Sequence, residues 1–227
     1  MKVFGKNVFN ELKDNPSSIK KVYLAKNFTD KEIIEFIQSH KISYTVTDMK
    51  VLDGMVDGKH QGIVVVVDDY EYVSCDTMYD DSVVVMLDHL EDPHNFGAII
   101  RTCEAAGIKS IIIPKDRSVS VNSTVMKTSA GALSNVQIAM VNNLVRTIDD
   151  FKKQGFFVYA ADMDGENYKN VSYSDKVLLI IGSEGNGVGR LVKENCDQIL
   201  AIPQYGHVNS LNASVAAAIL IYGIINQ

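Results

Sequence analysis

The stretch IPQYGHVNSLNASVAAAIL, residues 202–220, changes in its middle from the end of a strand to an apolar helix. Three small polar side chains, Ser210, Asn212 and Ser214, lie at the joint. Serine and asparagine oxygens accept hydrogen bonds from the free N–H groups of a first helical turn, so helix capping is the first interpretation. Because capping accounts for only one of the three, a second interpretation is that this turn holds a ligand.

Upstream of this stretch, short β-rich runs alternate with helical runs. The β-rich runs are SVVVMLD (82–88), SIIIP (110–114), VQIAMV (136–141), FFVYAAD (156–162), VLLIIG (177–182) and QILAIP (198–203). Helical stretches such as 97–107 and 144–155 lie between most of them and end at a glycine. Apolar strands joined by helices predict an α/β fold whose mainly parallel sheet is covered on both faces. Ligands of such sheets bind beyond the C-terminal ends of the strands.

The first seventy residues predict a separate, small α/β domain. Its candidate strands are residues 19–25, 42–46 and 62–68. A candidate helix, residues 28–40, has Thr29 or Asp30 available as its cap. The acidic stretch 68–81 shows neither helical nor alternating periodicity, which is typical of a linker. We therefore expect a domain at 1–70, an acidic linker at 71–81 and a second domain at 82–227.

The composition is that of a globular protein without a membrane segment. Of the 227 residues, 46% are hydrophobic and 22% are charged. No apolar run reaches the roughly 18 residues that would span a bilayer, and no N-terminal run has the pattern of a leader, so we expect a cytoplasmic protein. The three cysteines form no CxxC pair and no His/Cys cluster, so neither a disulfide framework nor a metal site is expected.

The net charge of −6 is unevenly distributed along the chain. Residues 1–27 contain six lysines but only two acids, Glu11 and Asp14. A basic N-terminal face of this kind can meet phosphates, although a solvated surface explains the same lysines.

A second polar segment is LDHLEDPHNFGAIIRTCEAAG, residues 87–107. Asn95 and Gly97 fall where a strand-to-helix loop is expected, and Arg101 falls near the first turn of an otherwise apolar helix. Arg101 is therefore expected close to the loop and partly desolvated. The structural alternative for this arginine is an ion pair with Asp88, Glu91 or Asp92.

A third polar segment, LLIIGSEGNGVGRLV (178–192), sets Glu184 inside a glycine-rich loop. The glycine spacing matches neither G-x-G-x-x-G nor G-x-x-x-x-G-K-[ST], so a phosphate cradle is not supported. A carboxylate in such a loop suits a cationic or hydroxyl-bearing ligand better. The three polar segments each follow a strand, so they could converge on one crevice.

Taken together, the three segments resemble motifs one, two and three of the SpoU family of RNA ribose 2′-O-methyltransferases, within the SPOUT superfamily. The matching stretches are NFGAIIR, IGSEGNG and IPQYGHVNSLNASVAAAI, and NSTVMKTSAGAL (122–133) is similar to the family segment between the first two motifs. The N-terminal part, from VFGKNVFNELK to KHQGIVVVV, resembles the L30e-like RNA substrate-binding domain of the 23S rRNA guanosine-2′-O-methyltransferase branch.

The resemblance implies more than the residues alone indicate. It implies a trefoil knot near the C-terminus and a homodimer packed through the knotted region. It also implies transfer of a methyl group from S-adenosylmethionine to a ribose 2′-hydroxyl, which in this branch belongs to a guanosine in 23S rRNA. The family positions that contact the cofactor correspond to Gly182, Ile202 and Leu211. No metal takes part in this scheme.

The resemblance also assigns roles to residues. The family's catalytic positions correspond to Asn95, Arg101, Glu184, Ser210 and Asn212. Because arginine is ordinarily always protonated, we expect Arg101 to orient the RNA phosphate and ribose, and direct action as a base is the weaker option. Lys20 and Lys21 of the N-terminal domain are the candidates for RNA contact.

Three alternatives stay open at this point. One is a tRNA guanosine 2′-O-methyltransferase of the same family, which in general carries short helical extensions instead of the N-terminal domain. Another is a non-catalytic RNA-binding protein of the same fold, which the intact set of polar motif residues disfavours. The third is a nucleotide-binding α/β enzyme, which the absence of phosphate-binding motifs disfavours.

Overall fold

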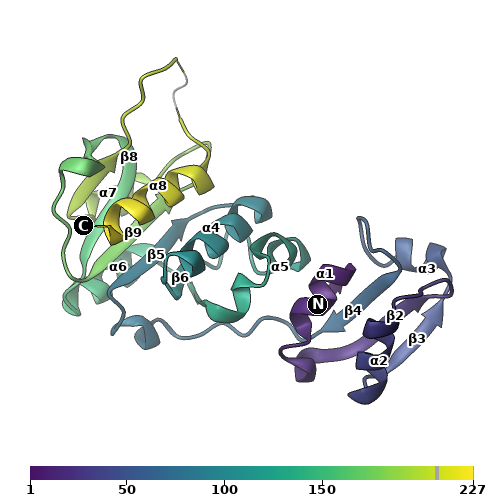
Figure 1. The fold of residues 1–227 in the computed structure, drawn as a ribbon. Coiled ribbons are helices and arrows are strands. Elements are labelled where there is room, and N and C mark those ends of the chain that lie inside the picture. Colours follow the sequence, from purple (N-terminus) through teal and green to yellow (C-terminus); the bar gives the residue numbers. More distant parts are fainter. Residues whose placement is uncertain (208–209, 227) are drawn as a thin grey trace. The chain divides into compact units, whose positions relative to one another are not determined.

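A computed structural model describes residues 1–207 and 210–226 of the chain (Figure 1). The chain divides into two compact units. The first comprises Met1–Glu71 together with Val121–Gly131, and the second comprises Tyr72–Ser120 together with Ala132–Gln227. Each unit has a sheet and a hydrophobic core of its own.

The first unit is a small α/β structure. Its elements are β1 (Lys2–Phe4), α1 (Lys6–Leu12), the 3₁₀ turn η1 (Pro16–Ser18), β2 (Ile19–Ala25), α2 (Lys31–Ser39), β3 (Tyr44–Thr47), α3 (Met49–Asp53), β4 (Ile63–Val67) and α5 (Ser123–Ser129). The strand order is β1-β4-β2-β3, and only the β2–β3 pair is parallel. Helix α2 begins at the predicted cap, where the Asp30 carboxylate accepts a hydrogen bond from Ile33 N.

The second unit contains a six-stranded sheet. Its elements are η2 (Cys75–Met78), β5 (Val83–Asp88), α4 (Pro93–Ala105), β6 (Ser110–Pro114), η3 (Ala132–Asn135), β7 (Gln137–Val141), α6 (Leu144–Lys153), β8 (Phe157–Asn167), η4 (Tyr168–Asn170), β9 (Val177–Gly182), α7 (Arg190–Glu194), β10 (Gln198–Ala201) and α8 (Ala213–Ile225). The order is β10-β8-β9-β5-β6-β7, and all five pairings are parallel. The α/β prediction with a parallel sheet is confirmed.

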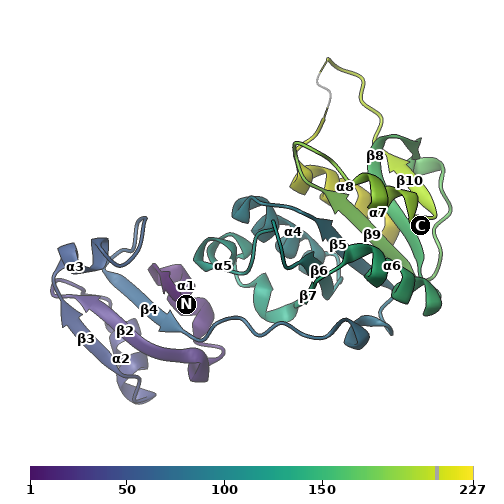
Figure 2. The same ribbon diagram turned by 180° about the vertical axis from the view of Figure 1, so that it is seen from behind.

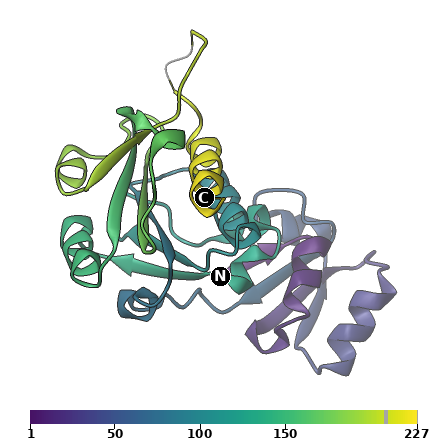
Figure 3. The ribbon, with the colours of Figure 1, turned by 60° about the vertical axis from the view of Figure 1, so that its left-hand side comes forward.

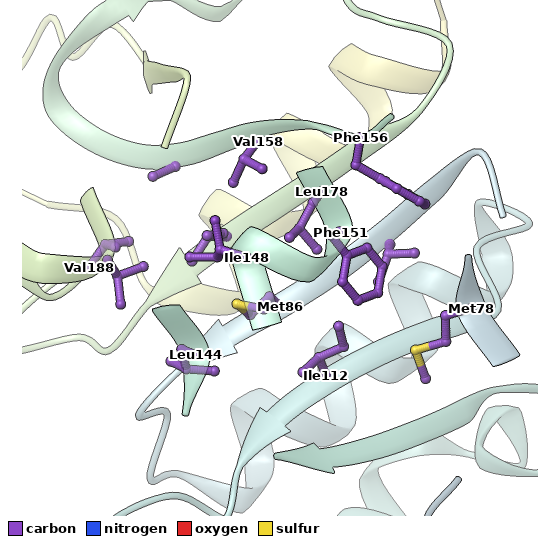
Figure 4. Close-up of a cluster of buried hydrophobic side chains, with 14 of the residues drawn as sticks. Met78, Met86, Ile112, Leu144, Ile148, Phe151, Phe156, Val158, Leu178 and Val188 are labelled. Atoms are coloured by element: carbon purple, nitrogen blue, oxygen red, sulfur yellow. The ribbon is translucent and has the colours of Figure 1, made fainter. Parts of the chain in front are cut away.

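Helices cover both faces of this sheet, as uniformly apolar strands require. Helices α4 and α8 lie side by side on one face, and α6 and α7 lie on the other (Figures 2 and 3). Ile148 and Phe151 are buried residues of α6. They pack against Met86 of β5 and Leu178 of β9 (Figure 4). The central strands are therefore fixed from both sides, which positions the loops at their ends.

Helix α4 begins four residues earlier than the predicted 97–107. The Asp92 carboxylate accepts a hydrogen bond from His94 N (2.8 Å), and Pro93 occupies the first helical position. Aspartate at the cap and proline at the first position are strong start signals, so they begin the helix before Gly97. As a result Asn95 lies in the first turn rather than in a loop, and Arg101 lies in the third turn.

Strand β8 is longer than the predicted 156–162, because it continues along β10. Gly165 permits this pairing: a Cβ added to Gly165 would lie 2.6 Å from the carbonyl carbon of Ile199. The register with β10 shifts between Ile199 and Leu200, at the same place. A side chain at residue 165 would separate the two strands.

Candidate functional site

The site is formed at the C-terminal ends of the central strands β5 and β9. Asp88 ends β5 and lies opposite Gly182, which ends β9. From β5 the chain moves to β6 on one side of the sheet, whereas β9 lies on the other side. This is the switch point at which open α/β sheets bind ligands.

The loop after β9, residues 182–189, is folded back on itself by backbone contacts. Ser183 N donates to Gly187 O (3.2 Å), and Gly187 N donates to Ser183 O (2.9 Å). Gly182 lies so close to the returning chain that an added Cβ would be 2.0 Å from the carbonyl carbon of Gly187. The buried carboxylate of Asp88 accepts from Gly189 N (2.7 Å) and holds the far end of the loop.

This loop presents Glu184 to two amide side chains from other elements. Asn95 Nδ2, from α4, donates to Glu184 Oε1. Asn212 Nδ2 donates to Glu184 Oε1 (3.2 Å) and to Asn95 Oδ1 (3.0 Å). The structure thus joins one predicted residue from each of the three polar segments in a closed hydrogen-bonded cluster, the Asn95–Glu184–Asn212 cluster.

Asn212 has two functions because its amide has two ends. Its Oδ1 caps α8 by accepting from Ser214 N (2.9 Å) and Val215 N (3.4 Å), and it also accepts from Ser214 Oγ (2.6 Å). Its Nδ2 is therefore free to join the cluster. Of the three small polar residues at the start of this helix, Asn212 is the cap.

A cavity of about 440 Å³ lies beside the cluster, between the 182–189 loop and the chain after β10. It is lined by all three predicted cofactor positions, Gly182, Ile202 and Leu211, and also by Glu184 and Ser210. The lining combines apolar residues, such as Leu220, with the carboxylates of Asp162 and Glu184, which suits an amphipathic cation.

Asp162 of β8 also lines this cavity, although sequence reasoning did not single it out. Burial raises the pKa of its carboxyl group, but hydrogen bonds, above all from Lys193 Nζ (2.6 Å), outweigh burial and leave the pKa below its usual value. The available signal was position: Asp162 and Asp88 each end an apolar β-rich run of the sequence.

A second cavity, of about 390 Å³, lies on the other side of the same loop. Its wall comprises residues 88–92, Arg117 and the loop residues 183–187 and 189. Residues 183–187 line both cavities, so a single loop separates them.

Arg101 does not join the cluster of its own chain. It lies six positions after Asn95 on α4, which places it about 120° away around the helix and ~9 Å further along. Its side chain is exposed and lines neither cavity, so the expected partial desolvation is wrong. Within the described residues it forms no ion pair with Asp88, Glu91 or Asp92.

Lys20 and Lys21 belong to the first unit, on β2. Lys20 Nζ forms an ion pair with Asp68, and both side chains are more than half exposed. Lys21 Nζ lies over the ring of Tyr23, 4.9 Å from its centroid. The two predicted RNA contacts are thus on the surface, but part of the Lys20 charge is offset locally.

Other kinds of site find little support in the part of the chain that the structure describes. No group of three or more His, Cys, Asp or Glu side chains is arranged to hold a metal ion. Burial raises the pKa of the Cys103 thiol to about 12, so this thiol stays protonated at neutral pH. None of the helices in residues 1–207 and 210–226 has the length and apolar character needed to cross a bilayer.

Comparison with known proteins adds two family matches. The model of the SpoU rRNA Methylase family matches residues 82–222, and the model described as RNA 2′-O ribose methyltransferase substrate binding matches residues 2–73. YacO of Bacillus subtilis (strain 168), assigned to the TrmH family of tRNA/rRNA methyltransferases, is 40% identical over 233 positions, which cover 98% of this chain and 94% of that protein.

Solved structures show the same fold. The SpoU methyltransferase AviRb from Streptomyces viridochromogenes, in complex with AdoMet, superposes with a TM-score of 0.87 at 20% identity, covering 100% of this chain and 89% of that chain. A protein of Porphyromonas gingivalis assigned to the TrmH family of RNA methyltransferases superposes with a TM-score of 0.77 at 25% identity, covering 98% and 88%.

The folded-back loop gives a direct structural prediction. Gly182→Ala will open the 182–189 loop, because the new Cβ would overlap the Gly187 carbonyl carbon. Gly185→Ala is the matched control, since a Cβ there meets nothing within 4 Å. We expect amide hydrogen exchange of Ser183 and Gly187 to accelerate at least ~10-fold in Gly182→Ala but to stay near wild type in Gly185→Ala. Equal exchange in both variants would contradict the contact.

Proposed function

Because the chain belongs to the SpoU family of RNA methyltransferases, we propose that it transfers the methyl group of S-adenosylmethionine to the ribose 2′-hydroxyl of a guanosine in 23S rRNA. The observation that carries this proposal is the Asn95–Glu184–Asn212 cluster at the edge of the larger cavity. The match of residues 2–73 to a ribose 2′-O substrate-binding domain supports the choice of the 2′-hydroxyl. A reaction on ribosomal RNA would place the protein in the cytoplasm.

The larger cavity fits the proposed methyl donor. Its volume of about 440 Å³ lies within the ~300–1,000 Å³ range of small-molecule sites. Ile202 and Leu211 offer apolar contact to an adenine ring, and the Asp162 and Glu184 carboxylates suit the positive charges of the ammonium and sulfonium groups. AviRb, which shares this fold, was solved with AdoMet. We further propose that this C-terminal part of the chain forms the trefoil knot implied by the family.

In the proposed reaction, the 2′-oxygen forms a bond to the methyl carbon, the carbon–sulfur bond breaks to leave S-adenosylhomocysteine, and the hydroxyl proton passes to a carboxylate or to water. The reaction therefore requires alignment and a path for one proton. Asn95 and Asn212 hold Glu184 Oε1 through two N–H donors. Oε2 makes no such bond among the described residues, so it is the oxygen that can accept from the ribose. Ser210, at the cavity wall, would complete the contacts.

Mapping of ribose methylation tests the substrate. Cells that lack the protein should lose one 2′-O-methylguanosine in 23S rRNA, and the purified protein should restore it with S-adenosylmethionine. Loss of a mark in tRNA instead would support the tRNA alternative, which the names of the relatives also cover. Unchanged methylation of both RNAs would contradict the proposal.

The cluster can be tested with Asn95→Ala, which removes hydrogen bonds to Glu184 and Asn212. Because misplacement of a reacting group by ~1 Å costs about 10²-fold, we expect kcat/KM to fall by about that factor. The Kd for S-adenosylmethionine should change little, since Asn95 lines neither cavity. Asn135→Ala, which removes a single hydrogen bond to Glu104, is the matched control and should keep full activity.

We also propose a homodimer, on the basis of the outer face of α8. This helix is apolar on all sides, which is typical of a helix that is covered by protein. Val215 and Tyr222, one above the other on this face, are 46% and 43% exposed. Arg101 lies exposed on α4, beside α8. A second copy that covers α8 would bring its own Arg101 towards the cluster that Arg101 does not reach within one chain.

Mixing two inactive variants tests this arrangement. In a dimer of Arg101→Ala and Asn95→Ala chains, one of the two sites would contain an intact arginine and an intact cluster. Because half of the dimers in an equal, exchanged mixture are mixed, about a quarter of wild-type activity should return. If Arg101 acted within its own chain, the mixture would stay inactive. Val215→Glu should dissociate the dimer in sedimentation experiments.

The first unit is proposed to bind folded RNA through phosphate contacts. Neutralising Lys20 and Lys21 together should weaken RNA binding and reduce its salt dependence, by up to about two units in the slope of log K against log salt. The effect of Lys21 alone should be larger, because Asp68 already offsets part of the Lys20 charge. Lys153→Ala, a surface lysine of the second unit paired with Asp150, is the control. Unchanged affinity and slope in the double variant would contradict this role.

A further inference from the structure

The second cavity, of about 390 Å³ and bounded by residues 88–92, Arg117 and the glycine loop, is not used by the proposed methyl donor. We propose that it takes the base of the target nucleotide, and that Glu91 reads the Watson–Crick edge of guanine there. This inference rests on the proposed function and deepens it, because it assigns the specificity for guanosine to a residue.

The first step of the argument is position. Residues 183–187 line both cavities, and Glu184 is one of them. A nucleotide whose 2′-hydroxyl lies at Glu184, facing a donor in the larger cavity, must place its base close by, because base and ribose are directly bonded. The second cavity is the hollow that adjoins Glu184 on the side away from Ile202 and Leu211.

The second step concerns which carboxylates are available. Asp88 is 2% exposed and already binds Gly189 N and the His89 ring. Asp92 caps α4 through His94 N. Glu91 is exposed, lines the cavity and makes no hydrogen bond or ion pair to any described residue. It is thus the one carboxylate of residues 88–92 with both oxygens free to bind a ligand side by side.

The third step is the chemistry of the cavity wall. Three carboxylates besides Glu91 line it, against a single guanidinium, that of Arg117, so a phosphate would be repelled. An uncharged group with hydrogen-bond donors fits better. An ionised carboxylate accepts two hydrogen bonds side by side. Guanine presents two adjacent donors, N1–H and the N2 amine, whereas adenine, cytosine and uracil place an acceptor next to their donor.

Arg117 fits the same assignment. It is exposed, it forms no ion pair among the described residues, and its backbone is in the left-handed region (φ 51°), as is that of His89 (φ 53°). Non-glycine residues held in this region are uncommon. The guanidinium can bind the O6 and N7 acceptors on the other edge of guanine.

The test compares guanosine with inosine, which lacks the N2 amine. An RNA fragment that contains the mapped site is prepared with either base at the target position, and kcat/KM is measured with each. We expect the wild type to be ~10–100-fold slower on inosine, the range for a lost hydrogen bond to a charged group. Glu91→Ala loses both hydrogen bonds, so it should act on guanosine more slowly than the wild type acts on inosine, and should not distinguish the two bases.

Controls separate this inference from the proposed function. Asp116→Asn removes a nearby negative charge that does not line the cavity, and should keep the preference for guanosine. The Kd for S-adenosylmethionine should be unchanged in Glu91→Ala. An active Glu91→Ala enzyme that still prefers guanosine would overturn the role of Glu91 alone. A wild-type protein that methylates no RNA would overturn the proposed function, and the inference with it.

Discussion

The close approach of the Gly182 backbone to Gly187 and Val188 is the constraint on which the site depends. A Cβ at residue 182 would lie 2.2 Å from Val188 N, so the chain after β9 turns back only because that Cβ is missing. The turn carries Glu184 to Asn95 and Asn212, and it forms the wall that separates the two cavities. Asp88, on the neighbouring strand, fixes the far end of the turn.

Several polar groups of the site also serve the fold. The Asn212 side chain donates from its nitrogen to the cluster and caps α8 with its oxygen. Asp92 caps the start of α4, and the helix start in turn places Asn95 in the first turn. Of these three residues Asn95 is the buried one, and the hydrogen bonds with Glu184 and Asn212 satisfy both ends of its amide. Substitutions here therefore affect local stability and chemistry together.

The sequence was informative where local pattern decides the structure. Strands 19–25, 110–114 and 177–182 have the predicted bounds, because an apolar run that ends in polar or glycine residues limits a strand by itself. The side of α4 from which the Arg101 side chain extends was not predictable in this way. It depends on where α4 begins, and the prediction overlooked the Asp92–Pro93 start signal.

Side-chain partners that are distant in the sequence also could not be predicted from local sequence pattern. Lys20 pairs with Asp68, and Asn95 meets Glu184 across 89 positions of sequence. For the second pair, convergence followed from the rule that the ends of parallel strands meet at one edge of a sheet, but no rule identified which atoms would bond. The resemblance to a family named the residues, and the structure supplied the hydrogen bonds between three of them.

The single loop between the two cavities has a thermodynamic consequence. Residues 183–187 form a wall with two faces, so any ligand that orders this wall from one side changes the surface offered on the other. Ligands on the two sides would then be coupled, and the coupling free energy is the same in both directions. Through a loop of five residues, the binding of each ligand would thus change the affinity for the other, without any movement of the strands.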